Sequence, residues 1–357
     1  MGTDKKTYGI GIVGCGNISG THAEAIQRTQ KGTLVAAHSR TKENVEQFGR
    51  EYDIPWFTSY EEFLNHPGLD IVVICTPSGT HLDYGVSAAE AGKHVIVEKP
   101  IEITVARGKS LINACDDNGV KLAVIYQSRF TGDIIRMKEI IDRQDIGDIV
   151  MASASVKWFR SQEYYSESSW RGTLDLDGGG AVINQSIHTI DLLQWFAGGV
   201  KSISAFKGTF THEGIEAEDN AVACLSFNNG AIGVFEASTS ITPPQERKVE
   251  INGTKGTLLL EGDTLHKKLE GDSGDEKQDK SGESAGAASP LAGMTCQNHK
   301  NQYDSILKAF LNGTEPTVSG TDSLQSLAIV EGLYKASDKQ EVVHIDDILA
   351  SEAVTQK

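Results

Sequence analysis

The chain has 357 residues, of which 39% are hydrophobic and 23% are charged, enough apolar material for two domains with buried cores. Its formal charge of −16 argues against nucleic acid or an anionic membrane surface as partner, because both need a basic face. The five cysteines form no C-x-x-C pair and no run is apolar enough to span a membrane. We therefore expect no disulfide framework and no metal site, and a cytoplasmic location.

Strands and helices alternate over the first part of the chain. Apolar runs predict strands at 8–13, 34–38, 71–75, 95–97 and 122–125, separated by helices at about 18–29, 42–52, 83–91 and 104–118. Unbroken apolar strands that alternate with helices are typical of a parallel sheet covered on both faces. We predict a doubly wound α/β domain over residues 1–127, with a dinucleotide-binding function.

A glycine-rich turn follows the first predicted strand. It has the form G-x-G-x-x-S, with Gly14, Gly16 and Ser19, and leads into a predicted helix. Gly14 permits the tight turn, Gly16 lets the backbone approach a pyrophosphate, and the helix N-terminus favours negative charge. This context predicts a dinucleotide site that Asn17 and Ile18 also contact.

The second strand ends without the acid that normally binds the adenosine ribose. Its place is taken by Ser39, which removes a carboxylate that would repel a 2′-phosphate. Arg40 is able to pair with that phosphate or to stack on adenine. The pattern favours NADP over NAD. The alternative is that Arg40 is a solvated loop charge and that NAD binds through the Ser39 hydroxyl.

Two later strand ends carry further candidates. Thr76 and Pro77 follow the third strand in a loop over the cofactor, and His81 either contacts the cofactor or packs the next helix. Glu98 and Lys99 close the strand at 95–97, and ligands of open α/β sheets bind outside the carboxyl ends of the strands.

Lys99 is the first predicted catalytic residue. Burial beside a cationic nicotinamide would lower its pKa, so that it exchanges a proton near neutrality, and when charged it would stabilise an alkoxide as hydride leaves. We expect it to contact both cofactor and substrate, and Glu98 to orient or neutralise it beside the cofactor.

From about Gly147 the pattern changes to strands joined by short turns. Strand-like runs at 149–158, 202–211, 221–227, 232–239, 248–252 and 256–260 are interrupted by one helix at about 180–196. The turns at 228–230 and 252–254 suit hairpins. We predict an α+β domain with a largely antiparallel sheet over 128–345, a mobile loop over 271–290, helices at about 300–311 and 323–335, and a tail over 346–357.

The helix at 180–196 follows three glycines and carries a second group of candidates. Asn184 and His188 are four residues apart and so share one helix face. Asp191, three residues further on, is expected to steady His188. A neutral histidine paired with Lys99 would be a second proton carrier for a hydroxyl that is being oxidised.

A run of aromatic and basic residues precedes this helix. Flat rings beside guanidinium groups suit a polyhydroxylated ring, although the same residue types are enriched at oligomer interfaces. The predicted substrate contacts here are Trp158, Arg160, Trp170 and Arg171.

Taken together, these motifs resemble the Gfo/Idh/MocA family of oxidoreductases. The resemblance extends from Gly9 to about His344. The matching segments are 14–18 with His22, 75–77 with His81, 98–100, 127–130, 178–180 and the helix through His188 and Asp191.

The resemblance implies a Rossmann domain joined to an open-faced α/β domain, a tightly held NAD or NADP, and Lys99 as the family's lysine. It implies oxidation of a secondary ring alcohol of a sugar, cyclitol or nucleotide sugar, with Asn184, His188, Gln127 and Arg129 among the substrate contacts. It further implies a homodimer or homotetramer formed through the sheet. The family commonly has Asp-x-x-x-His in the second domain, whereas this chain has Asn184, which leaves His188 without its usual carboxylate at this spacing.

Two alternatives stay open on the same fold. One is a glycosidase or epimerase that uses NAD in a closed redox cycle. The other is a non-catalytic ligand-sensing protein, against which the presence of both Lys99 and His188 argues.

Overall fold

The computed structural model describes residues 7–271 and 295–354. The described residues divide into two compact units: unit 1 contains residues 7–127, 295–324 and 352–354, and unit 2 contains residues 128–271 and 325–351. The first division between the units lies after residue 127, which is the end of the first domain predicted from the sequence. Residues 295–324 return to unit 1, so their expected place in the second domain is wrong. The expected loop at 271–290 lies outside the described residues except for Gly271.

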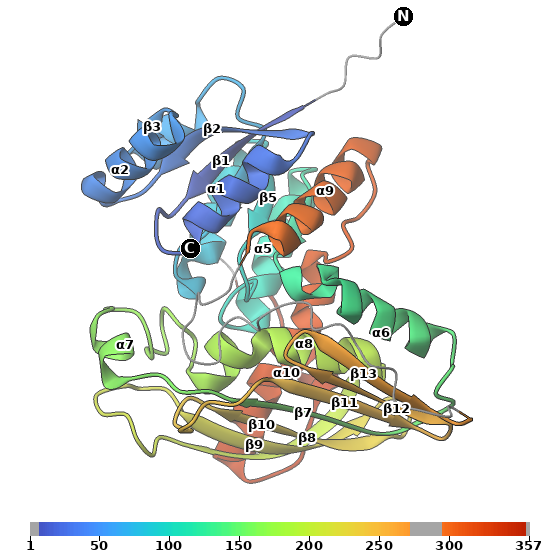
Figure 1. The fold of residues 1–357 in the computed structure, drawn as a ribbon. Helices are drawn as coiled ribbons and strands as arrows, with labels where there is room; N and C mark the ends of the chain where they lie inside the picture. The colour runs from blue at the N-terminus through green and yellow to red at the C-terminus, as the bar shows by residue number, and fades with distance from the viewer. Residues whose placement is uncertain (1–6, 272–294, 355–357) are drawn as a thin grey trace, which may run out of the picture. The chain divides into compact units, whose positions relative to one another are not determined.

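Unit 1 is built on a six-stranded parallel sheet of order β3-β2-β1-β4-β5-β6 (Figure 1). This is the Rossmann order, in which the direction of strand addition reverses between β1 and β4. All residues of β1 and β4 are buried, as expected for strands covered on both faces. The strands are β1 (Tyr8–Val13), β2 (Gly32–His38), β3 (Trp56–Phe57), β4 (Ile71–Ile74), β5 (His94–Val97) and β6 (Leu122–Val124).

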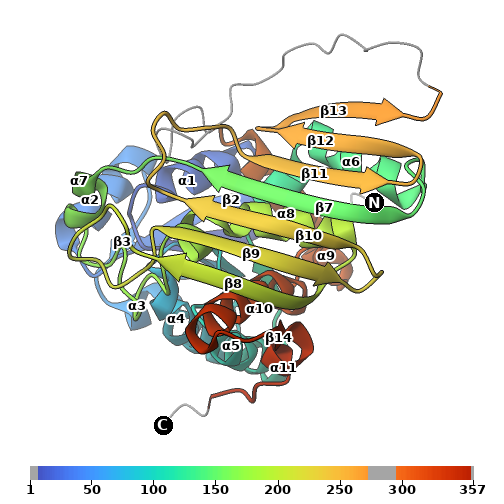
Figure 2. The same ribbon diagram turned by 90° about the horizontal axis from the view of Figure 1, so that it is seen from below.

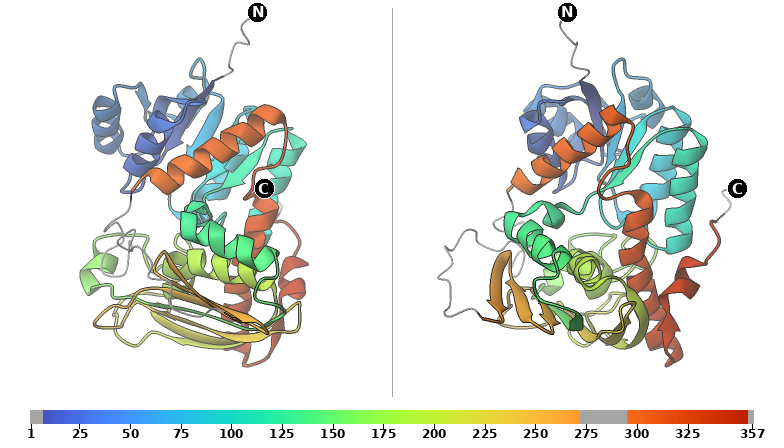
Figure 3. Two further views of the ribbon diagram at one scale, coloured as in Figure 1. Left: turned by 45° about the vertical axis from the view of Figure 1, so that its right-hand side comes forward. Right: turned by 90° about the vertical axis from the view of Figure 1, so that its right-hand side faces the viewer.

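A helix from far along the chain completes the core of unit 1. Helix α9 lies beside α1 (Figures 1 and 3), and both share one core with alternate strand residues such as Ile12 and Ile96. Because side chains alternate between the two faces of a strand, Glu98 is directed to the same face as Ile96. The helices are α1 (Ser19–Arg28), α2 (Lys42–Tyr52), α3 (Tyr60–Leu64), α4 (His81–Glu90), α5 (Val105–Asp117) and α9 (Gln297–Asn312).

Unit 2 contains an eight-stranded sheet of order β13-β12-β11-β7-β10-β9-β8-β14 (Figure 2). Neighbouring strands are antiparallel except β7 and β10, which are parallel. The strands are β7 (Ile149–Lys157), β8 (Val200–Gly208), β9 (Asn220–Phe227), β10 (Ile232–Ser238), β11 (Lys248–Gly253), β12 (Gly256–Glu261), β13 (Thr264–Leu269) and β14 (Val343–His344).

Helices cover one face of this sheet and leave the other exposed. Helix α8 packs on β7 and β11, and α6 packs on β13, whereas Figure 2 views the opposite face. Along β9, Ala221, Ala223 and Leu225 are buried, whereas Val222 and Cys224 between them are exposed. The helices are α6 (Gly132–Asp142), α7 (Gln162–Ser166), α8 (Ser186–Ala197), α10 (Gly320–Lys339, which begins in unit 1) and α11 (Ile345–Leu349).

The predicted fold class is confirmed in both halves, with differences in detail. The sequence analysis did not predict β3, α3, α6, α7, β13 or β14, and α11 lies in the predicted tail except for Ile345. The predicted helix at 180–196 begins instead with a π-helical turn, η3 (Ala181–Gln185), which precedes α8. In the described part of the chain, no helix combines the length and the apolar character needed to cross a membrane.

Candidate active site

The glycine turn in unit 1 has the geometry that a dinucleotide requires. Gly14 has φ +92°, and a Cβ built on it would lie 2.9 Å from the Cys75 carbonyl, so only glycine fits. A Cβ on Gly16 would meet no atom within 4 Å, which leaves the backbone open to an incoming phosphate. The Ser19 hydroxyl donates to the Gly16 carbonyl at 2.6 Å, so Ser19 closes the turn in place of a third glycine. Asn17 is exposed and Ile18 half-buried at the start of α1.

The end of β2 presents a hydroxyl and a cation. Ser39 is half-buried, and its Oγ accepts from the backbone N–H of Thr41 at 3.3 Å. Arg40 is exposed, and none of the described carboxylates forms an ion pair with it. Burial lowers the pKa of the preceding His38, and the charge of Arg40 lowers it further, so that ring is neutral. Ser39 and Arg40 are therefore the polar groups available to the adenosine ribose at this strand end.

The loop after β4 is held by His81. Thr76 and Pro77 are half-buried before the short 3₁₀ turn η1 (Ser78–Thr80). The two ring nitrogens of His81 lie 3.0 Å from the carbonyl oxygens of Pro100 and Thr76, and the residue is 1% exposed. These contacts support the packing alternative for His81: any contribution to cofactor binding comes from holding the loop, because the ring is not exposed.

Glu98 and Lys99 lie where β5 ends, and the Lys99–Pro100 peptide bond is cis. Lys99 is half-buried, whereas Glu98 is buried on the face covered by α1 and α9. One carboxylate oxygen of Glu98 accepts from the Lys99 backbone N–H at 3.0 Å, and the other lies 2.8 Å from His22 Nε2. Glu98 therefore supports the backbone of Lys99 from inside the unit. The sequence analysis had matched His22 to a family pattern without giving it a role.

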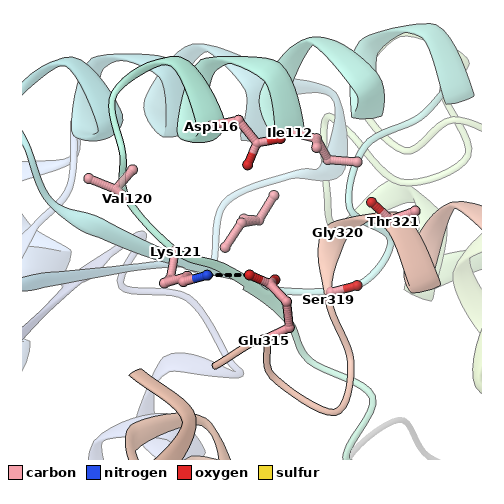
Figure 4. A pocket seen from close by; sticks show the side chains of 9 residues that line it. Ile112, Asp116, Val120, Lys121, Glu315, Ser319, Gly320 and Thr321 are labelled. Atoms are coloured by element: carbon pink, nitrogen blue, oxygen red, sulfur yellow. Dashed lines mark hydrogen bonds and ion pairs between the residues drawn. The ribbon is translucent and has the colours of Figure 1, made fainter. Parts of the chain in front are cut away.

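A hollow of about 380 Å³ in unit 1 lies at the other end of the sheet (Figure 4). It is lined by Asp116 of α5, by Glu315 and by Lys121 and Leu122, where β6 begins. Lys121 and Glu315 form an ion pair across it. Because Leu122 marks the amino end of its strand, this hollow is separate from the dinucleotide site at the carboxyl ends.

In unit 2, Asn184 and His188 are the half-buried residues of an otherwise buried segment. Every other residue from 179 to 194 is buried. Asn184 lies in the π-helical turn η3 and His188 in the first turn of α8, so the ideal α-helical spacing expected between them is changed. Their partial exposure still makes them the residues of this segment that are open to a ligand.

A carboxylate that the sequence analysis missed lies against Asn184. Asp177, which is 2% exposed, accepts from the Asn184 side chain through Oδ1 and from the Gly172 backbone N–H through Oδ2. Gln185 then donates to Asn184 Oδ1 at 2.7 Å. The substitution at position 184 has thus not removed a carboxylate from this region: Asp177 supplies one from the residue before the three glycines. That position is the signal in the sequence that could have identified it.

The predicted aromatic and basic residues form one cluster within unit 2. Arg160, 2% exposed, donates to Gln185 Oε1 at 3.0 Å and lies over the rings of Trp158 and Tyr164. Arg171 lies over Tyr164 at 4.3 Å and over Trp170 at 5.7 Å. Burial lowers the pKa of Arg160.

This cluster also retains a hydrogen-bond donor. The Trp158 indole Nε1 is buried, and no described residue accepts its hydrogen bond. In unit 1, Gln127 Oε1 is likewise buried and has no hydrogen-bond partner within the described ranges. Both groups suit a polar ligand, because buried polar atoms in native structures are nearly always satisfied.

Arg129 and Asp191 form a buried ion pair, which bears on the roles predicted for both residues. Arg129, in the 3₁₀ turn η2 (Gln127–Phe130), donates from Nε and Nη2 to both oxygens of Asp191 at 2.7 and 2.6 Å. Asp191, 0% exposed, also accepts from Ser326 at 2.8 Å. Burial of the Arg129 guanidinium in an ion pair argues against the substrate contact expected of it. Asp191 braces Arg129 instead of His188.

A Rossmann sheet, a glycine turn and a lysine at a strand end define an NAD(P)-dependent oxidoreductase that acts on CH–OH groups, and the comparisons agree. The family model described as "Oxidoreductase family, NAD-binding Rossmann fold" matches residues 8–126, and the "GFO/IDH/MocA C-terminal domain" model matches residues 134–259. The chain belongs to the Gfo/Idh/MocA family of oxidoreductases.

Individual relatives agree with this membership. Oxidoreductase P35 of Formosa agariphila is 30% identical over 70% of this chain and 77% of its own length. The NAD(+)-dependent scyllo-inositol 2-dehydrogenase of Bacillus subtilis is 28% identical over 70% and 72%. Among solved structures, the WlbA dehydrogenase of Bordetella pertussis in complex with NADH and UDP-GlcNAcA is 30% identical, with a TM-score of 0.84 over 95% of this chain and 99% of that one.

Proposed function

We propose that the protein transfers hydride between a nicotinamide cofactor and a secondary ring alcohol of a sugar, cyclitol or nucleotide sugar. The observation that carries the proposal is Lys99 at the carboxyl end of β5, with its backbone held by Glu98, in the same sheet as the open Gly16 turn. Dinucleotides bind across this end of a Rossmann sheet, so the lysine is suited to lie beside the nicotinamide.

In this mechanism two side chains handle the proton and the developing charge. The cofactor, when bound, supplies the hydride chemistry. As an ammonium group, Lys99 would stabilise the alkoxide from which hydride leaves; as a neutral amine, it would take the hydroxyl proton itself. His188 is the second proton carrier, and Asn184, held by Asp177, orients a substrate hydroxyl.

Replacement of Lys99 tests this role directly. Lys99→Ala is expected to lower kcat by about 10²–10⁴-fold while NAD(P)H still binds. The matched control is Lys93→Ala, at the other end of the same strand, where Nζ donates to the Leu69 carbonyl. A screen of sugars and cyclitols that follows nicotinamide absorbance identifies the substrate. Full turnover by Lys99→Ala would refute the proposal.

The basic cluster of unit 2 favours an anionic substrate within this class. Arg160 and Arg171 flank Tyr164, and the Trp158 indole offers a further donor. Guanidinium groups recognise carboxylates and phosphates in a bidentate manner. One relative, WlbA, was solved with UDP-GlcNAcA, a nucleotide sugar, bound. A nucleotide sugar is therefore the first candidate, and neutral cyclitols are the second.

The cofactor is NAD or NADP, and Arg40 favours NADP. Arg40 is exposed at the end of β2, where Ser39 stands in place of a repelling acid. Arg40→Gln is expected to weaken NADP(H) binding by about ten- to a hundredfold, as for a hydrogen bond to a charged group, and to leave NAD(H) binding unchanged. Arg50→Gln, on the neighbouring helix α2, is the control. Tighter binding of NAD(H) than NADP(H) to the unaltered protein would overturn this preference.

The open face of the unit 2 sheet is suited to bind a second copy of the chain. Phe206, Val222, Ile232 and Val234 lie on neighbouring strands and are 48–62% exposed. In register, Phe206 lies opposite Val222, Val234 opposite Cys224 and Ile232 opposite Ser226. Exposed apolar patches of this kind mark interaction surfaces. We propose that this face forms the interface of a homodimer or homotetramer. We also propose that the protein is located in the cytoplasm.

A further inference from the structure

A chain of buried polar side chains in unit 1 leads to the backbone of Lys99. Tyr303 of α9 contacts His22 Nδ1 at 2.7 Å, and His22 Nε2 contacts Glu98 Oε1 at 2.8 Å. The second oxygen of Glu98 accepts from the Lys99 N–H. His22 and Tyr303 are both 0% exposed. The sequence analysis gave Tyr303 no role, since it lies more than 200 residues from Lys99 and was assigned to the other domain.

We propose that His22 and Tyr303 are positioning residues for catalysis: they hold the Glu98 carboxylate in one orientation, which fixes Lys99 and keeps a negative charge beside its ammonium group. The inference rests on the proposed function, because it gives these residues their effect through Lys99. Neither residue contacts the substrate in this mechanism.

The direction of the hydrogen bonds follows from the charges. Burial alone would raise the pKa of Glu98, but the hydrogen bond from His22 is the largest of the effects that lower it to about 2, so the carboxylate only accepts. His22 therefore donates from Nε2–H, and its Nδ1 shares the second hydrogen bond with the Tyr303 hydroxyl. Burial raises the pKa of Tyr303 well above its ordinary value, so the phenol keeps its proton. The three hydrogen bonds thus form one continuous series from Tyr303 through His22 and Glu98 to the Lys99 backbone.

The other titratable groups around Glu98 are uncharged, so none of them neutralises its carboxylate. The His299 ring lies edge-on to His22 at 5.1 Å, and burial lowers its pKa to about 3, so it is neutral. Burial raises the pKa of the Cys75 thiol, just after β4, well above its ordinary value, and burial raises that of Cys15, in the glycine turn, to about 12. Both thiols remain protonated.

The same cluster also meets the spacing of a metal site. Ligand atoms of His22, Glu98 and His299 lie within 4.8 Å of one another. However, both ring nitrogens of His22 are already used in the hydrogen-bond chain, and a metal ion would displace the Nε2 proton. Complete hydrogen bonding of His22 favours positioning over metal binding, and metal analysis of the purified protein distinguishes the two.

The test compares two replacements of His22 of similar size. His22→Leu removes the donor to Glu98 and is expected to lower kcat by about 10–100-fold, with little change in cofactor affinity. His22→Gln keeps an N–H at the position of Nε2 and is expected to recover most of the loss. His94→Gln, at the amino end of β5, is the control for substitution in the same sheet, and circular dichroism verifies folding.

A pH–rate profile separates positioning from simple structural support. Glu98→Gln removes the negative charge beside the ammonium group, which favours the neutral amine, so the acid limb of the profile should move to lower pH. Loss of packing alone would lower the rate without moving the limb. An unmoved limb, equal losses in His22→Leu and His22→Gln, or stoichiometric metal that His22→Leu loses would each overturn the proposal.

Failure of the positioning proposal can be told apart from failure of the proposed function. If Lys99→Ala keeps full turnover, the role of Lys99 fails, and this inference fails with it. If Lys99→Ala is inactive but His22→Leu has the kcat of the unaltered protein, only the positioning proposal fails.

Discussion

The sheet of unit 1 is buried on both faces, whereas the sheet of unit 2 is covered on one face and exposed on the other. In the described part of unit 1 a ligand is therefore expected at strand ends, and Gly16, Arg40 and Lys99 all follow the carboxyl ends of strands. In unit 2 the helix-covered face carries Asn184 and His188, and the open face carries Phe206 and Val222.

The difference shows how each unit distributes its roles. A sheet covered on both sides concentrates binding and chemistry at one rim, so single backbone positions there are decisive. A sheet with one open face separates its tasks, because the two sides of each strand face different surroundings. Substitutions should thus have local effects on cofactor binding in unit 1 and separable effects on stability and assembly in unit 2.

The largest expected effect is at the rim of unit 1. Gly14→Ala adds a Cβ 2.9 Å from the Cys75 carbonyl at φ +92°. Backbone strain should cost about 1–3 kcal/mol and overpacking about the same again, with loss of cofactor binding. Calorimetric titration with NAD(P)H and thermal unfolding measure both effects. Gly16→Ala, which meets no atom within 4 Å, should retain its fold, and equal instability in the two variants would contradict the steric argument.

The next largest effect is a loss of stability on breaking a buried ion pair inside unit 2. Asp191→Ala leaves the Arg129 guanidinium buried without its carboxylate and should cost about 3–5 kcal/mol of unfolding free energy. Asp145→Ala, which breaks the exposed Arg143–Asp145 pair, should cost less than about 1 kcal/mol. Thermal unfolding of both variants makes the comparison. Similar losses would show that burial does not distinguish the pairs.

Glu218 gives unit 2 a pH dependence of stability. Burial raises its pKa to about 7, although it accepts hydrogen bonds from the backbone of Gly180 and Val182 and from Tyr334. Its folded pKa exceeds the ordinary value of 4.5, so the folded state holds the proton longer, and stability should fall as pH rises from about 4.5 to about 7.

The Glu218→Gln variant tests this dependence. Between pH 4.5 and 8 the unaltered protein should lose about 1–3 kcal/mol more unfolding free energy than Glu218→Gln, because the amide does not titrate. Glu213→Gln, an exposed position nearby, should keep the original dependence. Chemical denaturation at a series of pH values provides the measurement, and parallel curves for all three proteins would refute the assignment.

The smallest expected effect concerns the open face. Val234→Glu places a charge in the middle of the exposed apolar patch and should weaken self-association by more than about tenfold, without unfolding the chain. Val342→Glu replaces a valine that is 59% exposed, against 48% for Val234, and that lies outside the sheet strands, so it should leave the assembly unchanged. Sedimentation equilibrium measures the masses. If the unaltered protein is a monomer, the proposal that this face binds a second copy of the chain is wrong.

Local sequence patterns predicted the parts of the fold that depend on local physics. Apolar runs located the five long strands of unit 1, because strands buried on both faces have little polar character, and the glycine turn was apparent from Gly14 and Gly16. The two-residue strand β3 carries too few residues for such a signal.

Long-range partners were not accessible in the same way. Asp191 was assigned to His188 because the two share a helix, yet Arg129, 62 residues away, has the stronger charge complementarity. The partner of Tyr303 is His22, which lies 281 residues away in the sequence and meets it only through tertiary packing. Spacing along the sequence carries no information on such pairings.

The return of α9 to unit 1 has a consequence for how the protein is made. Tyr303 and Phe310 belong to the same core as Ile12 on β1, but a ribosome synthesises them only after nearly all of unit 2 has emerged. Translation of the first 127 residues therefore cannot complete the hydrophobic interior of the cofactor-binding unit. Nascent chains should acquire dinucleotide affinity late, after the segment that contributes Tyr303 has left the exit tunnel.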